Sequence, residues 1–419
     1  MRAQQASVIL LLLLSATNVQ AQSAHACIQG LGTQNERIWW TGAANGKYLM
    51  NFVGGAPVLS NAGIGQTGSF EGTAVYTTAA GALLLYTDGD SIFNGQTNAL
   101  IGTGVGGNVS ATEAAQIVPD PAGVPTNDFY VFGNSTNVTP APINFTKVNI
   151  SANTIGPIAA LGGGVAFGES LGVVPAANGT DFWILSVTGA NPAVNAYLVT
   201  AAGVAGSAVS AAVPSLPVGT TANRGTLIYH PPTRQLAFSF YSTATGTGYI
   251  YTATFDEFTG MTSGFVQQAT GQLGYSVAFS PDGSKLYYSV GVEGYSGTLT
   301  QKDLTTSVVS PIAAGSWAMP RLAPDGRIYV VGFGQTTMGV INSPDGAFPS
   351  IGWAPTGVTL PAGATSGFAL VNQTYAPCSV NGPAPTSAVP LLGPYPLSVL
   401  VLLLGITGVA SMRGWRGKA

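Results

Sequence analysis

The chain has 419 residues, enough for two or three domains or for one large domain built from repeats. Charged residues make up only 7% of it, whereas Gly (57), Pro (27) and hydrophobic residues (46%) are plentiful; this balance is typical of secreted, turn-rich β proteins and excludes a helical bundle. Residues 22–395 hold nine Lys and Arg against sixteen Asp and Glu, so this acidic part is not expected to bind nucleic acid.

The N-terminal residues predict a secretory signal peptide. Arg2 is followed by an apolar run over residues 8–14, and small residues come just before Gln22. We expect cleavage between Ala21 and Gln22, so that residues 1–21 are removed. The remaining chain would then be secreted into an oxidising compartment.

Six later segments repeat one pattern: an apolar strand, a turn of Pro, Asp, Asn or Gly, and a second strand. Apolar and polar residues alternate with period two around these turns, which predicts β-hairpins. Pro fixes φ and Gly accepts a positive φ, so Pro-Asp-Gly favours a tight turn. The segments begin at Thr73, Ala115, Leu171, Thr226, Ser276 and Met319.

The spacing of the repeat predicts a β-propeller. From Pro119 onward the turn prolines are separated by 56, 56, 50 and 43 residues. This leaves room for four strands per unit, as in a propeller blade, and is too long for a solenoid coil. A closed ring also protects sheet edges that an open stack would expose. We therefore predict an all-β, single β-propeller with seven blades; six or eight blades are the alternatives.

The two ends of the predicted propeller contain strand-like segments beside the only two cysteines. We expect "RIWWTGAANGKYLMNF" near the start and "SGFALVNQTYAPC" near the end to complete the seventh blade together. A disulfide between Cys27 and Cys378 would then fasten the ring. Two free thiols are the alternative. The propeller ectodomain is predicted to span residues 22–378.

Three glutamates occupy the same place in successive units. Glu71, Glu113 and Glu169 each lie six residues before the turn position. If these positions open the innermost strands, the carboxylates lie at one mouth of the central channel, where a cation, an arginine or a polar ligand would have to compensate their charge. The alternative is that each glutamate caps local backbone amides. The predicted ligand-binding residues at this channel mouth are Glu71, Glu113, Glu169, Arg224, Tyr275 and Trp317.

The sequence offers few residues for catalysis. Its only histidines are His25 and His230, so a histidine base or a multi-histidine metal site is not expected. The aspartates that follow Pro in turns, Asp282, Asp325 and Asp345, are expected to bond backbone amides. We predict no catalytic residue, no metal ligand and no cofactor; a structural cation is the alternative left open.

The ordered set of motifs resembles the propeller region of one family of bacterial surface proteins. The motifs include "GSFEGTAVYTTAAGALLLYTDGDSIFN", "ATEAAQIVPDP", "ESLGVVPAANGTDFWIL", "YSVAFSPDGSKLYYS" and "APDGRIYVVGFGQTTMGVINSPD". The family is that of the gliding-motility-associated, type IX secretion type B sorting proteins, and the resemblance covers roughly residues 37–375. It implies a β-propeller on an exported protein. That family ends in an immunoglobulin-like sorting domain, whereas this sequence continues differently.

The C-terminal region predicts a membrane segment. Residues 379–388 form a Pro-rich linker, and residues 397–412 are apolar. The basic tail that follows suits a cytoplasmic end, so the bulk of the chain would face outward. The basic residues of the tail are Arg413, Arg416 and Lys418.

Residues 389–419 also resemble an IPTL-CTERM or PEP-CTERM type sorting tail, which has a short motif, an apolar segment and a basic end. Pro390 and Leu392 match the motif, Val389 stands for its Ile, and Tyr395 replaces its Trp. Leu391, Gly393 and Pro396 depart from it. The resemblance implies an exosortase-like processing enzyme as a partner; a plain membrane anchor is the alternative and predicts the same location.

These observations predict an exported, cell-surface β-propeller that is not an enzyme. It would act as a binding or interaction scaffold for carbohydrate, matrix or envelope partners. One alternative is a hydrolase or lyase that acts on polysaccharide at the channel mouth. Another is a structural component of an extracellular matrix.

Overall fold

The computed structural model describes the part of the chain that contains the predicted repeats. The described residues are 38–41, 48–60, 71–78, 80–136, 139–271, 273–292, 296–317, 319–368 and 370–371. The chain divides into two compact units, Met1–Cys378 and Ser379–Ala419, and all described residues belong to the first. The predicted signal peptide, both cysteines, the Pro-rich linker and the predicted membrane segment lie outside the described residues. No helix within those residues is long and apolar enough to cross a membrane.

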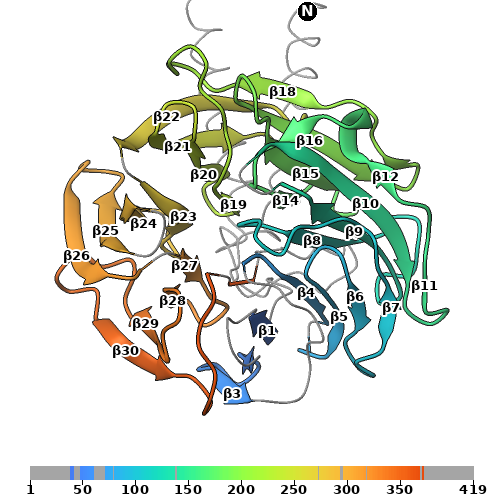
Figure 1. The fold of residues 1–419 in the computed structure, drawn as a ribbon, viewed down its shortest axis with the longest axis horizontal. Helices are drawn as coiled ribbons and strands as arrows, with labels where there is room; N and C mark the ends of the chain where they lie inside the picture. The colour runs from blue at the N-terminus through green and yellow to red at the C-terminus, as the bar shows by residue number, and fades with distance from the viewer. Residues whose placement is uncertain are drawn as a thin grey trace, which may run out of the picture. The chain divides into compact units, whose positions relative to one another are not determined.

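The described residues form seven antiparallel sheets arranged around a centre (Figure 1). The first sheet consists of β1 (Ile38–Thr41), β2 (Tyr48–Asn51) and β3 (Val58–Ser60). The second consists of β4 (Ala74–Thr77), β5 (Leu83–Thr87), β6 (Ile92–Asn94) and β7 (Leu100–Gly102). The third consists of β8 (Ala115–Pro119), β9 (Asp128–Asn134), β10 (Ala141–Asn149) and three short strands on β10, which are β11 (Thr154–Ile155), β12 (Ala159–Ala160) and β13 (Ala166–Phe167).

The remaining four sheets follow in chain order after a 3-10 turn at Leu161–Gly163. The fourth consists of β14 (Gly172–Pro175), β15 (Phe182–Val187), β16 (Ala193–Thr200), β17 (Gly203–Val204) and β18 (Val209–Ala212). The fifth consists of β19 (Leu227–His230), β20 (Gln235–Ser242), β21 (Thr247–Phe255) and β22 (Thr262–Gly271). The sixth consists of β23 (Leu273–Phe279), β24 (Lys285–Val292), β25 (Ser296–Asp303) and β26 (Val309–Gly315). The seventh consists of β27 (Met319–Leu322), β28 (Ile328–Val331), β29 (Thr337–Ile341) and β30 (Trp353–Thr359).

Each predicted hairpin forms the first two strands of one sheet. The Pro-Asp-Gly turns join β23 to β24 and β27 to β28, as expected from their sequence. Gly283 and Gly326 have φ values of +73° and +78°, a conformation that residues with a Cβ rarely adopt. Their amides donate to the carbonyl oxygens of Ser280 and Ala323, which closes the turns. Each copy of the sequence repeat therefore corresponds to the first hairpin of one blade.

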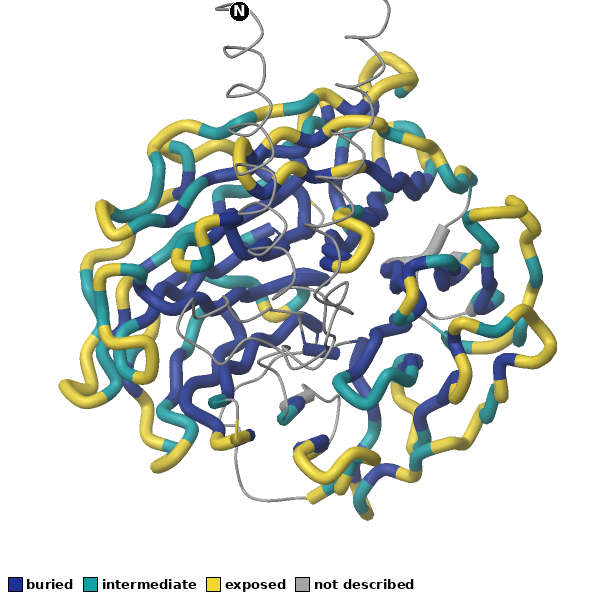
Figure 2. The backbone as a smooth tube through the Cα atoms, turned by 180° about the vertical axis from the view of Figure 1, so that it is seen from behind, coloured by how far each residue is buried: buried dark blue, intermediate teal, exposed yellow. Residues whose placement is uncertain are grey.

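Apolar side chains fill the space between neighbouring sheets. Ile228 and Ile250 of the fifth sheet, for example, share a buried cluster with Val277 and Phe279 of the sixth. The inner strands bury both faces in this way, which explains why β14, β19 and β27 are continuous runs of buried residues. Figure 2 shows the ring from behind, with the buried positions gathered in the inner strands and the exposed ones along the outer strands and turns.

The first and last sheets share a core, so the ring is closed. Trp39 and Met50 of the first sheet belong to the same buried cluster as Met319 and Tyr329 of the seventh. Val371, near the end of the described chain, is part of that cluster too. The prediction of a single seven-bladed β-propeller is confirmed. Residues 366–368 and 370–371 of the predicted closing segment form no strand, and the rest of that segment and both cysteines lie outside the described residues. The completion of the first blade by this segment and the Cys27–Cys378 disulfide stay predictions.

The two faces of the ring are distinct because the strands alternate in direction. One face carries the first turn of each hairpin, such as Pro281–Gly283 and Pro324–Gly326; we call it the turn face. The opposite face carries the points where the innermost strands start and the connections between sheets; we call it the start face. The predicted glutamate positions lie on the start face, at or just before those strands.

Candidate functional site

Glu113 lies at the centre of the ring, two residues before β8. The strands β8, β14, β19 and β27 surround this centre (Figure 1). Its side chain is 1% exposed. Oε2 accepts hydrogen bonds from the backbone amides of Leu171 (2.8 Å) and Leu227 (2.9 Å), at the starts of β14 and β19. One carboxylate thus holds the beginnings of two neighbouring blades.

The other oxygen of Glu113 faces an arginine from the seventh blade. Nη1 and Nη2 of Arg321, on β27, lie 3.4 Å and 3.3 Å from Oε1. Arg321 is fully buried, with 0% of its side chain exposed. These distances are longer than the roughly 2.7–2.9 Å of a strong ion pair, so the guanidinium compensates the buried charge incompletely. Burial accordingly raises the pKa of the Glu113 carboxyl to about 7, although Arg321 and the two amides act in the opposite direction.

The two other predicted glutamates bind the segment that precedes Glu113. Oε2 of Glu169 accepts hydrogen bonds from the backbone amide of Thr112 (2.9 Å) and from its hydroxyl. Oε1 of Glu71 accepts a long one (3.4 Å) from the hydroxyl of Ser110. Both side chains are at most 2% exposed. The carboxylates of Glu113 and Glu169 therefore bond backbone amides of adjacent blades and not local ones, whereas that of Glu71 bonds a side-chain hydroxyl.

The three further residues predicted at the channel mouth have different surroundings. Trp317 packs edge-on against Trp353 of the outer strand β30, with ring centroids 5.0 Å apart, in a cluster between the sixth and seventh blades. The backbone of Arg224 pairs with that of Tyr241, and its residue is half-buried. Tyr275 lies on β23, and its side chain is outside the described part. A ligand-binding role for these residues stays a prediction.

Arg321 is the residue that the sequence analysis missed. It lies inside the sixth repeat, in "MPRLAPDG". Among the innermost strands β4, β8, β14, β19, β23 and β27 it is the only Asp, Glu, Lys or Arg. The sequence signal for it was a single charged residue in an innermost strand, where the other units have none. Such a buried charge needs a partner of opposite charge, so it indicates a buried ion pair.

His230 lies apart from Glu113, at the opposite end of β19. His230 is 1% exposed, and its ring nitrogens lie 2.8 Å from the hydroxyl of Thr233 and 3.0 Å from the carbonyl oxygen of Pro281. It lies at a turn but is buried, and burial lowers its pKa. Within the described residues, no group of three or more His, Cys, Asp or Glu could hold a metal ion.

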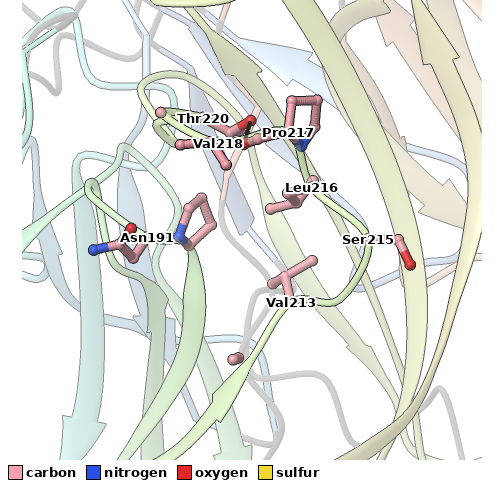
Figure 3. A pocket seen from close by; sticks show the side chains of 10 residues that line it. Asn191, Val213, Ser215, Leu216, Pro217, Val218 and Thr220 are labelled. Atoms are coloured by element: carbon pink, nitrogen blue, oxygen red, sulfur yellow. Dashed lines mark hydrogen bonds between the residues drawn. The ribbon is translucent and has the colours of Figure 1, made fainter.

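A groove opens on the start face of the fourth blade (Figure 3). It has a volume of about 330 Å³ and lies between the β15–β16 turn and the connection from β18 to β19. Leu216 and Val213 point toward its interior in Figure 3, and Val218 is fully exposed at the tip of the connection. Among the described residues, no charged and no aromatic one lines it. The lining residues are Asn191, Pro192, Ala212, Val213, Ser215, Leu216, Pro217, Val218, Gly219 and Thr220.

Comparisons with known proteins show similarity in structure at low sequence identity. Neither a protein-family model nor a curated protein matches this chain. A putative 6-phosphogluconolactonase from Bacteroides fragilis is similar in structure, with 12% identity over 80% of this chain and 97% of that one and a TM-score of 0.46. A periplasmic gluconolactonase from Pseudomonas aeruginosa has 12% identity over 81% of this chain and 99% of its own, with a TM-score of 0.46. TolB from Acinetobacter baumannii has 13% identity over 81% of this chain and 82% of its own, with a TM-score of 0.32.

Proposed function

We propose that this β-propeller is an exported scaffold that binds an uncharged, apolar segment of another envelope or surface protein. The observation that supports this most directly is the groove between the β15–β16 turn and the β18–β19 connection. Its Pro, Val and Leu side chains suit an aliphatic side chain or a proline of an extended peptide. Fully exposed Val218 at its rim offers further apolar contact.

The lining argues for a polypeptide over a carbohydrate. Sugar-binding surfaces commonly present aromatic rings, because a large flat apolar face packs against the sugar ring. None of the described residues that line the groove is Trp, Tyr or Phe. The absence of charge along it also disfavours acidic polysaccharides as ligands, since nothing there would neutralise them.

The alternative of a polysaccharide-acting hydrolase or lyase receives less support. Such an enzyme needs carboxyl groups within reach of a substrate. The carboxyl groups of Glu113 and Glu169 are instead buried and bonded to backbone amides of neighbouring blades. Their present role is to join blades.

The proposed location depends on the chain ends. The signal peptide at residues 1–21 and the segment 397–412 with its basic tail support export and attachment to the membrane. The resemblance of residues 389–419 to a sorting tail supports processing by an exosortase-like enzyme. Mass spectrometry of the mature termini tests the two cleavages: an intact N-terminus would contradict the signal peptide, and an intact C-terminus would contradict processing of the tail but not a plain membrane anchor.

The groove can be tested with a displayed library of random peptides against the full chain. We expect enriched peptides to be uncharged and apolar, and their binding to fall at least tenfold in Leu216→Ser and Val218→Ser. Val124→Ser is the matched control, because Val124 is an exposed valine on the turn face. Peptide binding that survives both groove variants would contradict the proposal. Saturable binding on a glycan array would point to a carbohydrate, and no binding in either assay to a structural matrix role.

A further inference from the structure

We propose that the apolar segment bound by the groove belongs to a second copy of this chain, so that two copies form a symmetric dimer through the start faces of their fourth blades. In this dimer the turn at residues 217–219 of each copy enters the groove of the other. The inference rests on the proposed function, because it names the occupant of the same groove. It is supported by a rigid apolar turn that lies beside an apolar groove.

The turn at residues 217–219 is exposed, apolar and held in one conformation. Val218 at its tip is fully exposed, and Pro217 and Gly219 on either side are exposed too. The carbonyl oxygen of Pro217 accepts hydrogen bonds from the amide (3.1 Å) and the hydroxyl (2.7 Å) of Thr220, which close the turn. The ring of Pro217 fixes its φ. Because a rigid segment loses little conformational entropy on binding, this turn is suited to insertion into a partner.

The segment that leads to this turn is fixed to the core of the ring. Val213 is buried in the cluster between the fourth and fifth blades, and Leu216 packs against that cluster. The hydroxyl of Tyr251 on β21 donates to the carbonyl oxygen of Pro214 (3.0 Å). Val218 itself adds nothing to this core. Its burial in a partner would remove its apolar surface from water, which favours association.

The groove offers a surface that matches the turn. Val213 and Leu216 point into it (Figure 3), and Pro192 lines it from the β15–β16 turn. Its volume of about 330 Å³ is at the low end for ligand pockets, so it fits a short segment such as one turn. The turn and the groove lie next to each other. A two-fold axis that passes between them therefore brings the turn of each copy to the groove of the other.

The distribution of charge allows two copies to meet at this place. Residues 22–395 hold nine Lys and Arg against sixteen Asp and Glu, so two copies repel each other elsewhere. Residues 182–223, which include β15 to β18 and the connection to β19, carry no Asp, Glu, Lys or Arg. A second copy therefore meets no like charge here, whereas a charged partner would find no group to pair with.

The test is sedimentation equilibrium of the full chain in mild detergent. One turn in one groove per copy is a small contact compared with the roughly 1,200–2,000 Å² of a stable interface, so the protein concentration should extend to about 1 mM. We expect the wild type to show a reversible monomer–dimer equilibrium. In Val218→Asp the dissociation constant should rise at least tenfold, because a carboxylate would be buried in a groove that offers no counterion.

Two further variants separate insertion of the turn from overall charge. Val124→Asp adds the same charge at an exposed valine of the turn face and should leave the equilibrium unchanged. Val218→Lys lowers the net negative charge, so it would strengthen association if general repulsion decided the outcome. If Val218 enters the groove of the other copy, Val218→Lys should instead weaken the dimer as Val218→Asp does.

The outcomes distinguish this inference from the proposed function. A chain that stays monomeric over the whole concentration range would overturn the inference, and so would equal dimerisation of the wild type and both Val218 variants. If peptides of the displayed library bind the groove of a monomeric chain, the groove takes a segment of a different protein and the proposed function stands. If neither a peptide nor a second copy binds, both proposals fail.

Discussion

The two ends of the innermost strands use carboxylates in different ways. On the turn face, Asp325 accepts from the backbone amide of Arg327 (3.1 Å), its Nε (2.8 Å) and the hydroxyl of Tyr329 (2.7 Å), all within four residues. On the start face, Glu113 bonds Leu171, Leu227 and Arg321, which are 58, 114 and 208 residues away. Asp325 thus shapes one hairpin, whereas Glu113 joins several blades. Asp345 is an exception on the turn face, since it accepts from the backbone amide of Asp282 in the sixth blade (3.0 Å).

This contrast predicts that substitutions on the start face weaken the whole ring, and that those on the turn face act on one blade. Arg321→Met should have the largest effect, because it leaves the carboxylate of Glu113 buried without its cation. Breaking a buried pair in this way typically costs about 3–5 kcal/mol of unfolding free energy. Urea denaturation at about pH 8 measures it.

The control for Arg321→Met is the double variant with Glu113→Leu. If the pair matters because each charge compensates the other, removing both should cost less than the sum of the two single losses. Additive losses would mean that Arg321 stabilises the seventh blade by itself, and that Glu113 acts only through the amides of β14 and β19.

Thr112→Val should lower the unfolding free energy by an intermediate amount. It tests the hydrogen bond that links the third and fourth blades. The substitution keeps the shape of the side chain and removes the hydroxyl that donates to the buried Glu169 carboxylate. Losing one donor to a buried charged group costs about 1–3 kcal/mol. Thermal unfolding measures the loss, and Thr180→Val, which removes a hydroxyl on an exposed turn, is the control. Equal shifts in the two variants would mean that the blade-to-blade bond adds nothing.

The fold was predictable because its signals are local. The hairpins from Thr73 onward repeat with a spacing that only a four-stranded blade accommodates, and Pro-Asp-Gly fixes the turns. The positions of Glu113 and Glu169 could be predicted for the same reason, since they recur at a constant offset from the turn. The partner of Glu113 could not, because no periodicity relates Arg321 to a residue 208 positions away. Trp317 shows the same limit: it lies one residue before the equivalent position of its unit, and its ring packs outward against Trp353.

Substitutions on the turn face should lower the unfolding free energy least, and Asp282→Asn tests this. Asp282 accepts hydrogen bonds from the hydroxyl of Ser280 and from Ser284, and these bonds lower its pKa to about 2 against burial, which acts in the opposite direction. A lowered carboxyl pKa stabilises the fold above the reference value of 3.8, and this stability is lost as the pH falls toward 2. Asn preserves most of the bonds and the site is largely exposed, so the loss should stay below about 1 kcal/mol at neutral pH and vanish in acid. A loss as large as that of Thr112→Val would contradict the division between local and ring-joining carboxylates, because it would show that a hairpin turn also carries the stability of the ring.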